Sequence, residues 1–306
     1  MSDSAANGEF GRRALRSLSD EIGAERVMFS VVIPTCHRND DLAKCLDRLA
    51  PGVQTLPFDQ YEVIVSDDGR STTAKSLVRE RFPWAWWLQG PCRGPAANRN
   101  NGAKVATGEW LVFTDDDCLP ADGFLAAYQA KAIGGGCEVL EGKTSPVGVR
   151  TRVDMECPIN ETGGYLWSCN FAIRKGLFSE LGGFDPAFPS AAMEDVDLRF
   201  RLLKAGNTIS FVPGSVVLHP WRKKRGRAFM RQHIASRIYC TNRHPEMTHS
   251  VTIRAVISEL TRQLFRQLPS AALSCHGKGL ARELFLLFYY YFYLGVAIAK
   301  RLLTTQ

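Results

Sequence analysis

The chain has 306 residues, of which 45% are hydrophobic and 23% are charged. This composition excludes disorder as the main state, and the length allows one large core or two small ones. The 38 Lys and Arg residues outnumber the 31 Asp and Glu residues. The resulting net charge of +7 favours an anionic partner, such as a nucleotide, an acidic lipid head group or nucleic acid, without selecting among them.

The nine cysteines are scattered, and no two of them form a C-x-x-C pair. This spacing indicates neither a disulfide framework nor a structural zinc site, and it favours a reducing cytoplasm. Residues 1–26 are polar, Ser-rich and charged, without the apolar segment of a signal peptide. We expect a loose tail there, with a short helix around Arg12 to Leu18.

Four apolar segments with strand character alternate with segments that have helical spacing. The expected strands are Met28–Ile33, which ends at Pro34, then Tyr61–Val65, Trp86–Leu88 and Trp110–Thr114, and the expected helices are residues 40–49, 72–81 and 96–106. This alternation predicts an α/β fold with a mostly parallel sheet covered by helices on both faces.

Ligands of such sheets bind beyond the carboxyl ends of the strands. Polar residues directly follow three of the expected strands, at Thr35–Arg38, Asp67–Asp68 and Asp115–Asp117. The sequence therefore predicts that these three separate segments converge on one crevice.

The pattern becomes irregular after Gly134, and then Glu194–Lys204 has the spacing of a helix. Residues 209–212 and 216–218 are expected to be short strands. Beyond Pro220 come the basic run WRKKRGR and helical sequence, which places a boundary near residue 221. We therefore expect a catalytic domain over residues 27–221 and a basic helical extension over residues 222–306.

Within that extension, Leu284–Ala299 contains sixteen residues without a charge. This is short of the roughly 20 apolar residues that cross a bilayer perpendicularly. A buried helix and a helix on a membrane surface with aromatic anchors are both compatible with the segment.

Three adjacent carboxylates, Asp115, Asp116 and Asp117, repel one another unless a cation lies among them. A divalent cation, Mn²⁺ or Mg²⁺, binds carboxylates together with diphosphate oxygens and stabilises a departing nucleotide. A solvated loop or a helix cap is the alternative interpretation. His219, at the end of an expected strand, is a candidate metal ligand, although a lone histidine is more often structural.

Other polar residues are open to two interpretations each. Asp67 and Asp68 precede Gly69, so they suit either a turn or contacts to a base or ribose. Glu194 and Asp195 begin a helix, where they either cap it or supply the base that deprotonates an acceptor hydroxyl. Arginines are candidate partners of the diphosphate, namely Arg38, Arg99 and the run Arg222–Arg227. Asp197 and Arg201 are expected to form an i, i+4 ion pair.

Taken together, four segments resemble the family 2 glycosyltransferases of the GT-A fold. They are VVIPTCHR at residues 31–38, VIVSDDG at 63–69, RNNGAKVATGEWLVFTDDDCLP at 99–120 and LGGFDPAFPSAAMEDVDLRFRLLKAG at 181–206. The resemblance covers about residues 30–220. It implies transfer of a sugar from a nucleoside diphosphate sugar, with inversion at the anomeric carbon and a divalent metal that assists the departing diphosphate.

The resemblance also implies roles for individual residues. Asp195 matches the catalytic base, and Asp117 with His219 matches the metal ligands. The nucleotide-sugar site would contain Pro34, Thr35, Arg38, Asp67, Arg99, Asp115 and Asp116, with Asp67 as the base-binding acid and Asp116 in a mainly structural role. The stretches at residues 167–170 and 182–184 match the sugar and acceptor pocket of the family, and acceptor contacts are assigned to Trp167, Asn170 and Glu194.

The expected partners are a UDP-sugar and a glycan or lipid-linked acceptor, with peripheral membrane contact through the C-terminal region, at the cytoplasmic face, and no nucleic acid. Gln232 is followed by His233-Ile234-Ala235 rather than by the Q-x-x-R-W signature of processive members, which favours single-residue transfer. Two alternatives are a nucleotidyltransferase, disfavoured because Val31–Arg38 contains no glycine, and a non-catalytic nucleotide-sugar or membrane-scaffold protein.

Overall fold

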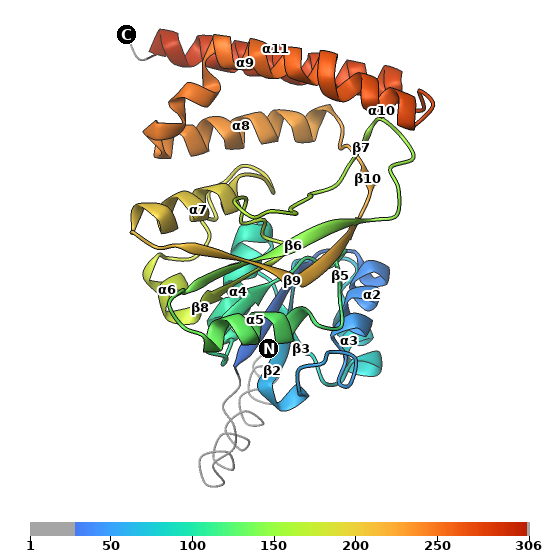
Figure 1. Ribbon diagram of the computed structural model, residues 1–306, viewed down its shortest axis with the longest axis vertical. Helices are drawn as coiled ribbons and strands as arrows, with labels where there is room; N and C mark the ends of the chain where they lie inside the picture. The colour runs from blue at the N-terminus through green and yellow to red at the C-terminus, as the bar shows by residue number, and fades with distance from the viewer. Residues whose placement is uncertain (1–27, 305–306) are drawn as a thin grey trace.

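The computed structural model describes residues 28–304 of the chain (Figure 1). The predicted tail, with its helix around Arg12 to Leu18, lies outside these residues. An eight-stranded sheet forms the centre of the molecule, in the strand order β3-β2-β1-β4-β8-β6-β9-β5. A layer of helices from the end of the chain lies over one edge of this sheet and above α7 (Figure 1).

One half of the sheet is parallel, as the alternation of strands and helices predicts. Its strands are β1 (Phe29–Thr35), β2 (Tyr61–Asp67), β3 (Trp86–Gln89) and β4 (Trp110–Phe113). The intervening helices are α2 (Asn39–Leu49), α3 (Lys75–Arg81) and α4 (Pro95–Val105). Because the four strands run in one direction, their carboxyl ends meet at one edge of the sheet.

Strand β1 continues through Pro34, where the sequence predicted its end. Proline lacks the N–H group that a ladder needs, so it is confined to positions where one neighbour is missing. Pairing between β1 and β4 stops at Val32 and Phe113, whereas pairing between β1 and β2 continues to Thr35. Pro34 therefore lies where the strand has only one pairing neighbour.

The other half of the sheet is mixed, and it includes strands from the region that was predicted to be irregular. Strand β8 (Phe171–Arg174) is antiparallel to β4, and β6 (Val139–Val147) is antiparallel to β8 and parallel to β9 (Ile209–Pro220). Strand β6, with the sequence VLEGKTSPV, lies in this irregular region and was not predicted, and it contains the acidic residue Glu141. That glutamate is buried, and its carboxylate accepts backbone N–H groups from Gly164 at 2.7 Å and Tyr165 at 2.8 Å.

Strand β9 is continuous, although two separate strands were predicted there. Gly142 of β6 pairs with Val212, and the next residue of β6, Lys143, pairs with Val216, so residues 213–215 of β9 form a bulge. A bulge keeps one strand intact while it bends the chain. The short β5 (Leu119–Pro120) completes the sheet by pairing with β9.

The two faces of the sheet each carry a hydrophobic cluster. Since alternate side chains of a strand point to opposite faces, Val31 and Ile33 lie in one cluster and Val32 in the other. The first face is covered by α2, α3 and α5 (Phe124–Ile133), and the second by α4, α6 (Lys175–Glu180) and α7 (Glu194–Lys204). The predicted bounds of the helix at residues 194–204 are confirmed.

Helices follow the sheet as far as the end of the described chain. They are α8 (Arg227–Arg243), α9 (Ile253–Arg262), α10 (Leu268–Ser274) and α11 (Leu280–Thr304), with a 3-10 turn at Pro245–Val251 and a π turn at Gln263–Gln267. A two-stranded ribbon of β7 (Met155–Glu156) and β10 (Arg222–Lys223) precedes them. The functional division of the chain at residue 221 stays a prediction.

Candidate active site

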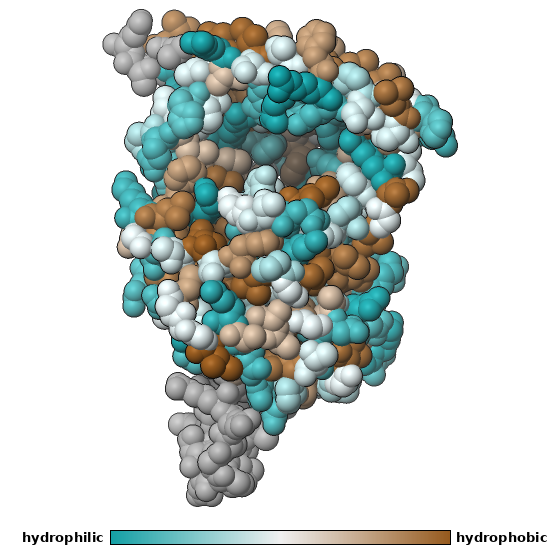
Figure 2. Space-filling model, viewed as in Figure 1, coloured by the Kyte–Doolittle hydropathy of each residue, from teal (hydrophilic) through white to brown (hydrophobic). Residues whose placement is uncertain are grey.

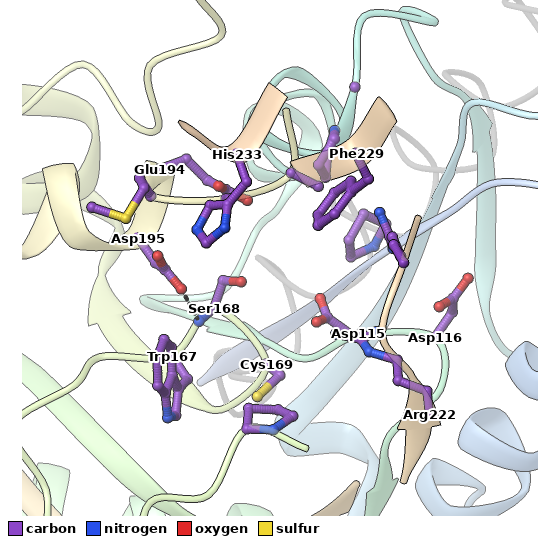
Figure 3. A pocket seen from close by; sticks show the side chains of 18 of the residues that line it. Asp115, Asp116, Trp167, Ser168, Cys169, Glu194, Asp195, Arg222, Phe229 and His233 are labelled. Atoms are coloured by element: carbon purple, nitrogen blue, oxygen red, sulfur yellow. Dashed lines mark hydrogen bonds between the residues drawn. The ribbon is translucent and has the colours of Figure 1, made fainter. Parts of the chain in front are cut away.

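A cavity of about 1280 Å³ lies at the carboxyl ends of the parallel strands (Figure 3). Its lining comes from the three segments that were predicted to converge, from a loop before β8, from the beginning of α7, and from the helices at the end of the chain. Representative lining residues are Pro34, Thr35, Arg38, Asp68, Arg99, Asp115, Asp116, Trp167, Ser168, Cys169, Glu194, Asp195, Arg222, Arg225, Phe229 and His233. The predicted convergence is confirmed.

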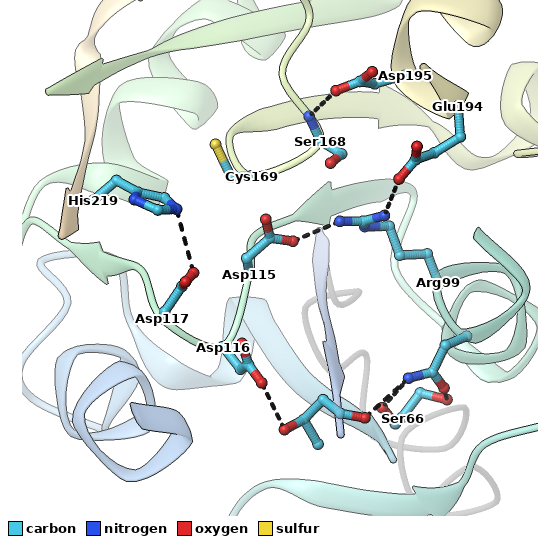
Figure 4. A network of polar contacts seen from close by, with 12 residues as sticks. Ser66, Arg99, Asp115, Asp116, Asp117, Ser168, Cys169, Glu194, Asp195 and His219 are labelled. Carbon is cyan, nitrogen blue, oxygen red and sulfur yellow. Dashed lines mark hydrogen bonds and ion pairs between the residues drawn. The ribbon is translucent and has the colours of Figure 1, made fainter. Parts of the chain in front are cut away.

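Arg99 holds two carboxylates together at one side of the cavity (Figure 4). Its guanidinium lies 2.6 Å from Asp115 Oδ1 and 3.2 Å from Glu194 Oε1. Arg99 is buried, and although burial lowers its pKa, Asp115 and Glu194 together raise that pKa above the ordinary arginine value. Arg99 extends from α4 and thereby fixes the end of β4 against the beginning of α7.

Asp116 is held by the first strand and the residue that precedes α2. The Thr35 hydroxyl donates to Asp116 Oδ2 at 2.8 Å, and the Arg38 guanidinium lies 3.0 Å from Asp116 Oδ1. Burial nevertheless raises the pKa of Asp116 to about 7, against the lowering effect of Arg38. With both oxygens engaged inside the protein, Asp116 joins two elements of the cavity wall.

Asp117 points away from its two neighbours, towards His219 (Figure 4). Its Oδ2 pairs with the guanidinium groups of Arg38 and Arg222, the latter at 3.2 Å. Its Oδ1 lies 3.4 Å from His219 Nε2. Burial favours the neutral acid, but His219, Arg38 and Arg222 together hold the pKa of Asp117 well below its usual range.

The atoms between Asp117 and His219 fit a divalent cation. Asp117 Oδ1 and His219 Nε2 are both buried, and neither has a hydrogen-bond partner among the described residues. His219 Nδ1 lies 2.9 Å from the Pro220 carbonyl oxygen, to which it donates, so Nε2 carries the lone pair in the neutral ring. Together with Cys118 Sγ, these ligand atoms lie within 4.8 Å of one another. Carboxylate and imidazole are donors that suit Mn²⁺, and the carboxylate alone suits Mg²⁺.

Glu194 and Asp195 enter the cavity at the first turn of α7. Met193, at φ 74°, makes the left-handed turn that leads into this helix. Asp195 Oδ2 accepts the Ser168 N–H at 3.3 Å, and Oδ1 accepts the Val196 N–H at 2.8 Å. Burial raises the pKa of Asp195, and burial also raises the pKa of Glu194, to about 7. Figure 3 shows Asp195 across the cavity from Asp115, Asp116 and Arg222.

Asp197 lies outside this cavity lining. It pairs with Arg201 at 2.8 Å, with Arg243 at 3.2 Å and with His244 at 2.8 Å. The predicted i, i+4 ion pair between Asp197 and Arg201 is therefore confirmed, and these contacts join α7 to α8.

Of the two neighbouring acids after β2, the cavity is lined by Asp68 and not by Asp67. The carboxylate of Asp67 accepts the backbone N–H groups of Gly69 at 2.8 Å and Ala74 at 2.6 Å, and the Trp87 indole N–H at 3.1 Å. These contacts hold the turn after the strand and leave Asp67 buried away from the cavity. Sequence reasoning chose the last residue of the strand, whereas the first residue beyond it reaches the cavity.

Asn170 also lies outside the cavity lining, in contrast to its predicted acceptor role. Its Oδ1 accepts the Tyr128 hydroxyl at 2.6 Å, and its Nδ2 donates to the carbonyl oxygens of Lys143 at 2.8 Å and Ser215 at 3.1 Å. These bonds join α5, β6 and β9 inside the protein. Trp167, by contrast, lines the cavity and stacks on Tyr165, with ring centroids 5.3 Å apart.

Several lining residues were not singled out individually from the sequence. Arg222 and Arg225 belong to the basic run whose side chains were candidate diphosphate partners. Phe229 and His233 come from α8, and their rings stack with centroids 6.3 Å apart. In the sequence, the two aromatic residues are four positions apart on an expected helix, which places them on one side of it. This spacing alone did not indicate that the helix faces the cavity.

Comparisons with known proteins place these observations in a family. Residues 30–181 match the family model described as "Glycosyl transferase family 2". Glycosyltransferase AglE of Haloferax volcanii is 27% identical over 209 residues, which are 63% of this chain and 67% of AglE. The GalNAc(5)-diNAcBac-PP-undecaprenol beta-1,3-glucosyltransferase of Campylobacter jejuni is 35% identical over 109 residues, 34% of each chain. The chain spans about half the length of several other curated glycosyltransferases that it matches.

The fold also matches solved structures. TarS 1-349 of S. aureus, in complex with UDP-GlcNAc, aligns with a TM-score of 0.53 at 22% identity. The alignment covers 68% of this chain and 66% of the TarS chain. A similarity at this level of identity concerns the fold alone, and it confirms the GT-A fold that the sequence predicted.

Proposed function

Because the chain belongs to glycosyl transferase family 2, a family of transferase enzymes, we propose that it moves a sugar from a nucleoside diphosphate sugar to a hydroxyl group of an acceptor. In this reaction the acceptor oxygen attacks the anomeric carbon as the bond from that carbon to the diphosphate oxygen breaks. Attack from the side opposite to the departing diphosphate inverts the configuration. The hydroxyl proton passes to a carboxylate of the enzyme.

The proposal rests above all on Asp195 as that carboxylate. Asp195 lines the cavity across from the acidic cluster, so an acceptor and a diphosphate would approach one sugar from opposite sides (Figure 3). Burial raises the pKa of Asp195, and a carboxylate with a raised pKa is a stronger general base. The N–H groups of Ser168 and Val196 hold the side chain in place.

The departing diphosphate would be received by arginines at the opposite wall. Arg38, Arg222 and Arg225 all line the cavity there. Burial lowers the pKa of Arg225, and the neighbouring charges of Arg222 and Arg38 lower it further, so the three cations lie close together. Guanidinium groups match phosphate oxygens in geometry and charge. Asp117 and His219 would hold a divalent cation, Mn²⁺ or Mg²⁺, which offsets charge on the leaving diphosphate when bound.

The donor and acceptor classes are proposed from the relatives and from the cavity. UDP-GlcNAc is the ligand of the TarS structure, which supports a UDP-sugar as donor. The name of the Campylobacter relative describes an undecaprenol-linked substrate, which supports a lipid-linked glycan as acceptor. Trp167 offers an aromatic face beside Asp195 on which a sugar ring can pack. We propose single-residue transfer, because α8 carries no Q-x-x-R-W signature.

We also propose that the reaction takes place in the cytoplasm. All nine cysteines are free thiols in the described chain, and five of them are buried, at Cys45, Cys118, Cys169, Cys240 and Cys275. A protein with many unpaired thiols suits a reducing compartment.

The direct test uses the full chain with Mn²⁺ and a panel of sugar nucleotides. A thermal-shift screen would identify the donor, since a ligand that binds the folded state raises its apparent stability. Release of the nucleoside diphosphate with an acceptor mixture then measures transfer. Asp195→Asn should abolish transfer and leave donor binding nearly intact, whereas Asp122→Asn, at a surface carboxylate, should change neither. Binding without transfer or hydrolysis of any donor would refute the proposed reaction, and loss of donor binding in Asp195→Asn would refute the base assignment.

A further inference from the structure

The four C-terminal helices contain a hydrophobic cluster of their own. Its members come mainly from α8, α9 and α11, and they include Ile234, Val256, Leu287, Tyr291, Leu294 and Ile298. Figure 1 shows α9 and α11 at the outer edge of the molecule, with α8 between them and the sheet. One side of α11 is therefore packed against protein.

The opposite side of α11 is exposed and also apolar. Phe285, Phe288 and Phe292 are 52%, 53% and 66% exposed, and Leu303 is 75% exposed. Spacings of three, four and eleven residues place these side chains along one side of a helix. The segment Leu280–Arg301 is long and apolar enough to cross a membrane, yet only 28% of its most apolar part is buried. Helix α11 is therefore apolar on two sides, and the part of the chain that the structure describes covers only one of them.

The exposed apolar residues are concentrated in this part of the chain. Among the described residues, 15 large hydrophobic side chains are exposed, and eight of them lie between Ile253 and Leu303. Besides those of α11, they are Ile253, Ile257, Phe265 and Leu273. Figure 2 shows apolar side chains along the upper edge of the molecule, over α9 and α11, with hydrophilic ones beside them. Such clustering distinguishes an interaction surface from the scattered exposed side chains of an ordinary protein.

The same segment carries the positive charge of the chain. Residues 222–306 contain 15 Lys and Arg and three Asp and Glu, a net charge of +12, although the whole chain has a net charge of +7. The preceding 221 residues are therefore net negative, by five charges. Arg227 lies 6.0 Å from the ring centroid of Phe285, and Arg231 lies 5.7 Å from that of Tyr289. Cations thus border the exposed aromatic face.

We propose that α9 and α11 dock on the surface of an anionic lipid bilayer, with α11 parallel to the membrane plane. Phe285, Phe288 and Phe292 would enter the boundary between head groups and acyl chains, and the bordering arginines would face lipid phosphates. A second copy of the chain fits this face less well, because two segments of +12 repel each other. A membrane span fits less well too, because it would withdraw Leu287, Tyr291 and Leu294 from α8 and α9.

Docking in this way would place the cavity at the bilayer surface. Phe229 and His233 of α8 line the cavity, as do Arg262, Gln263 and Gln267 at the end of α9 and in the π turn after it. Helices α8 and α9, on which α11 packs, therefore also line the cavity. An acceptor carried on a lipid would reach Asp195 without leaving the membrane, a consequence that rests on the proposed function, whereas the docking itself does not.

Flotation with vesicles tests the proposal on the full chain. The protein is mixed with vesicles of phosphatidylcholine alone, or of phosphatidylcholine with phosphatidylglycerol, and centrifuged through a density gradient. The wild type should float with the anionic vesicles, and high salt should weaken this binding. The variant Phe285→Ser/Phe288→Ser/Phe292→Ser should lose at least about tenfold in vesicle affinity, since each phenylalanine contributes apolar burial. The matched control Ile133→Ser/Val149→Ser, which changes side chains that are 71% and 82% exposed in the catalytic part, should float like the wild type.

A second measurement gives a gain of signal and does not depend on a disruptive variant. Phe288→Trp places an indole on the exposed face, and brominated acyl chains should quench its fluorescence beyond the quenching of the wild type. Absence of flotation, equal flotation of the triple variant, or absence of extra quenching in Phe288→Trp would each overturn the proposal. A dimer in solution that the triple variant dissociates would assign the face to a second copy instead, and retention in the membrane after alkaline carbonate would indicate a span. Donor binding, measured without lipid, distinguishes failure of docking from failure of the proposed function.

Discussion

Replacing Arg99 by methionine removes the guanidinium that lies between two carboxylates at the edge of the cavity. In the native protein it contacts Asp115 at 2.6 Å and Glu194 at 3.2 Å, and the Arg99 and Glu194 side chains are 5% exposed. Methionine keeps much of the apolar stem that packs beside Phe184, whose ring centroid is 5.5 Å from the guanidinium carbon. The substitution therefore tests the charge more than the packing.

The expected cost follows from the burial of the two carboxylates that remain. Removing one partner of a buried ion pair costs about 3–5 kcal/mol, because the other charge stays buried without compensation. Asp115 is 23% exposed and can be hydrated in part, so we expect the lower part of this range, about 3–4 kcal/mol. The free energy of unfolding of Arg99→Met should fall by that amount in urea denaturation at about pH 8.5, above the pKa of about 7 that Glu194 has in the native protein.

The loss should become smaller in acid. Burial already raises the pKa of Glu194 to about 7, and removal of Arg99, which lowers it, raises it further. At about pH 5.5 the folded variant therefore keeps the Glu194 proton, and a neutral carboxyl group needs no counter-charge, so roughly half of the loss should disappear. The control is Arg79→Met, which breaks an exposed pair with Glu80 and should cost at most about 1 kcal/mol. A loss no larger than that of the control, or an equal loss at both pH values, would refute the electrostatic role of Arg99.

Other substitutions test the remaining assignments. Asp195→Asn should lower kcat by about 10²–10⁴-fold, because a general base contributes that much, with a donor Kd within about threefold of the wild type in calorimetry. In the wild type the rate should rise with pH through the raised pKa of Asp195 and then level off, since the base acts when deprotonated; a flat profile in acid would contradict this role. His219→Ala should raise the Mn²⁺ concentration required for half-maximal activity by at least about tenfold, and an unchanged Mn²⁺ titration would exclude His219 as a ligand. Asp67→Asn should lower the free energy of unfolding by about 1–3 kcal/mol through lost backbone hydrogen bonds and leave donor binding unchanged. The carboxylate of Asp68 also accepts backbone N–H groups, from Cys92 and Gly94, so Asp68→Asn should destabilise the fold as well and in addition weaken donor binding. Weakened donor binding in Asp67→Asn alone would return the nucleotide contact to Asp67.

Local patterns in the sequence determined the parallel half of the fold. Apolar runs such as residues 28–33 and 110–114 form strands because their side chains are buried on both faces, and the spacing within residues 194–204 forms a helix because one side packs on the sheet. The ends of parallel strands meet at one edge, so the convergence of Arg38, Asp68 and Asp115 was also predictable. These features depend on residues close together in the chain.

Tertiary contacts decided which of the neighbouring residues face the cavity. Asp67 and Asp68 are chemically alike, and both carboxylates accept backbone N–H groups, but only Asp68, the first residue beyond strand β2, lines the cavity. Asn170 follows the cavity loop in sequence, yet distant carbonyl oxygens of Lys143 and Ser215 hold its amide inside the protein.

Tertiary contacts also decided which helices lie over the cavity. Phe229 and His233 are more than a hundred residues beyond Asp115 in the chain, and no local pattern indicates that α8 lies against the cavity. For the apolar segment at residues 284–299, too, the sequence predicted the helix and the tertiary structure decided which side is buried. Its sequence determined a helix rich in aromatic residues, but a helix apolar on all sides does not reveal which side will be covered. Packing against α8 and α9 decided that Leu287 and Leu294 are buried and that Phe288 and Phe292 remain exposed.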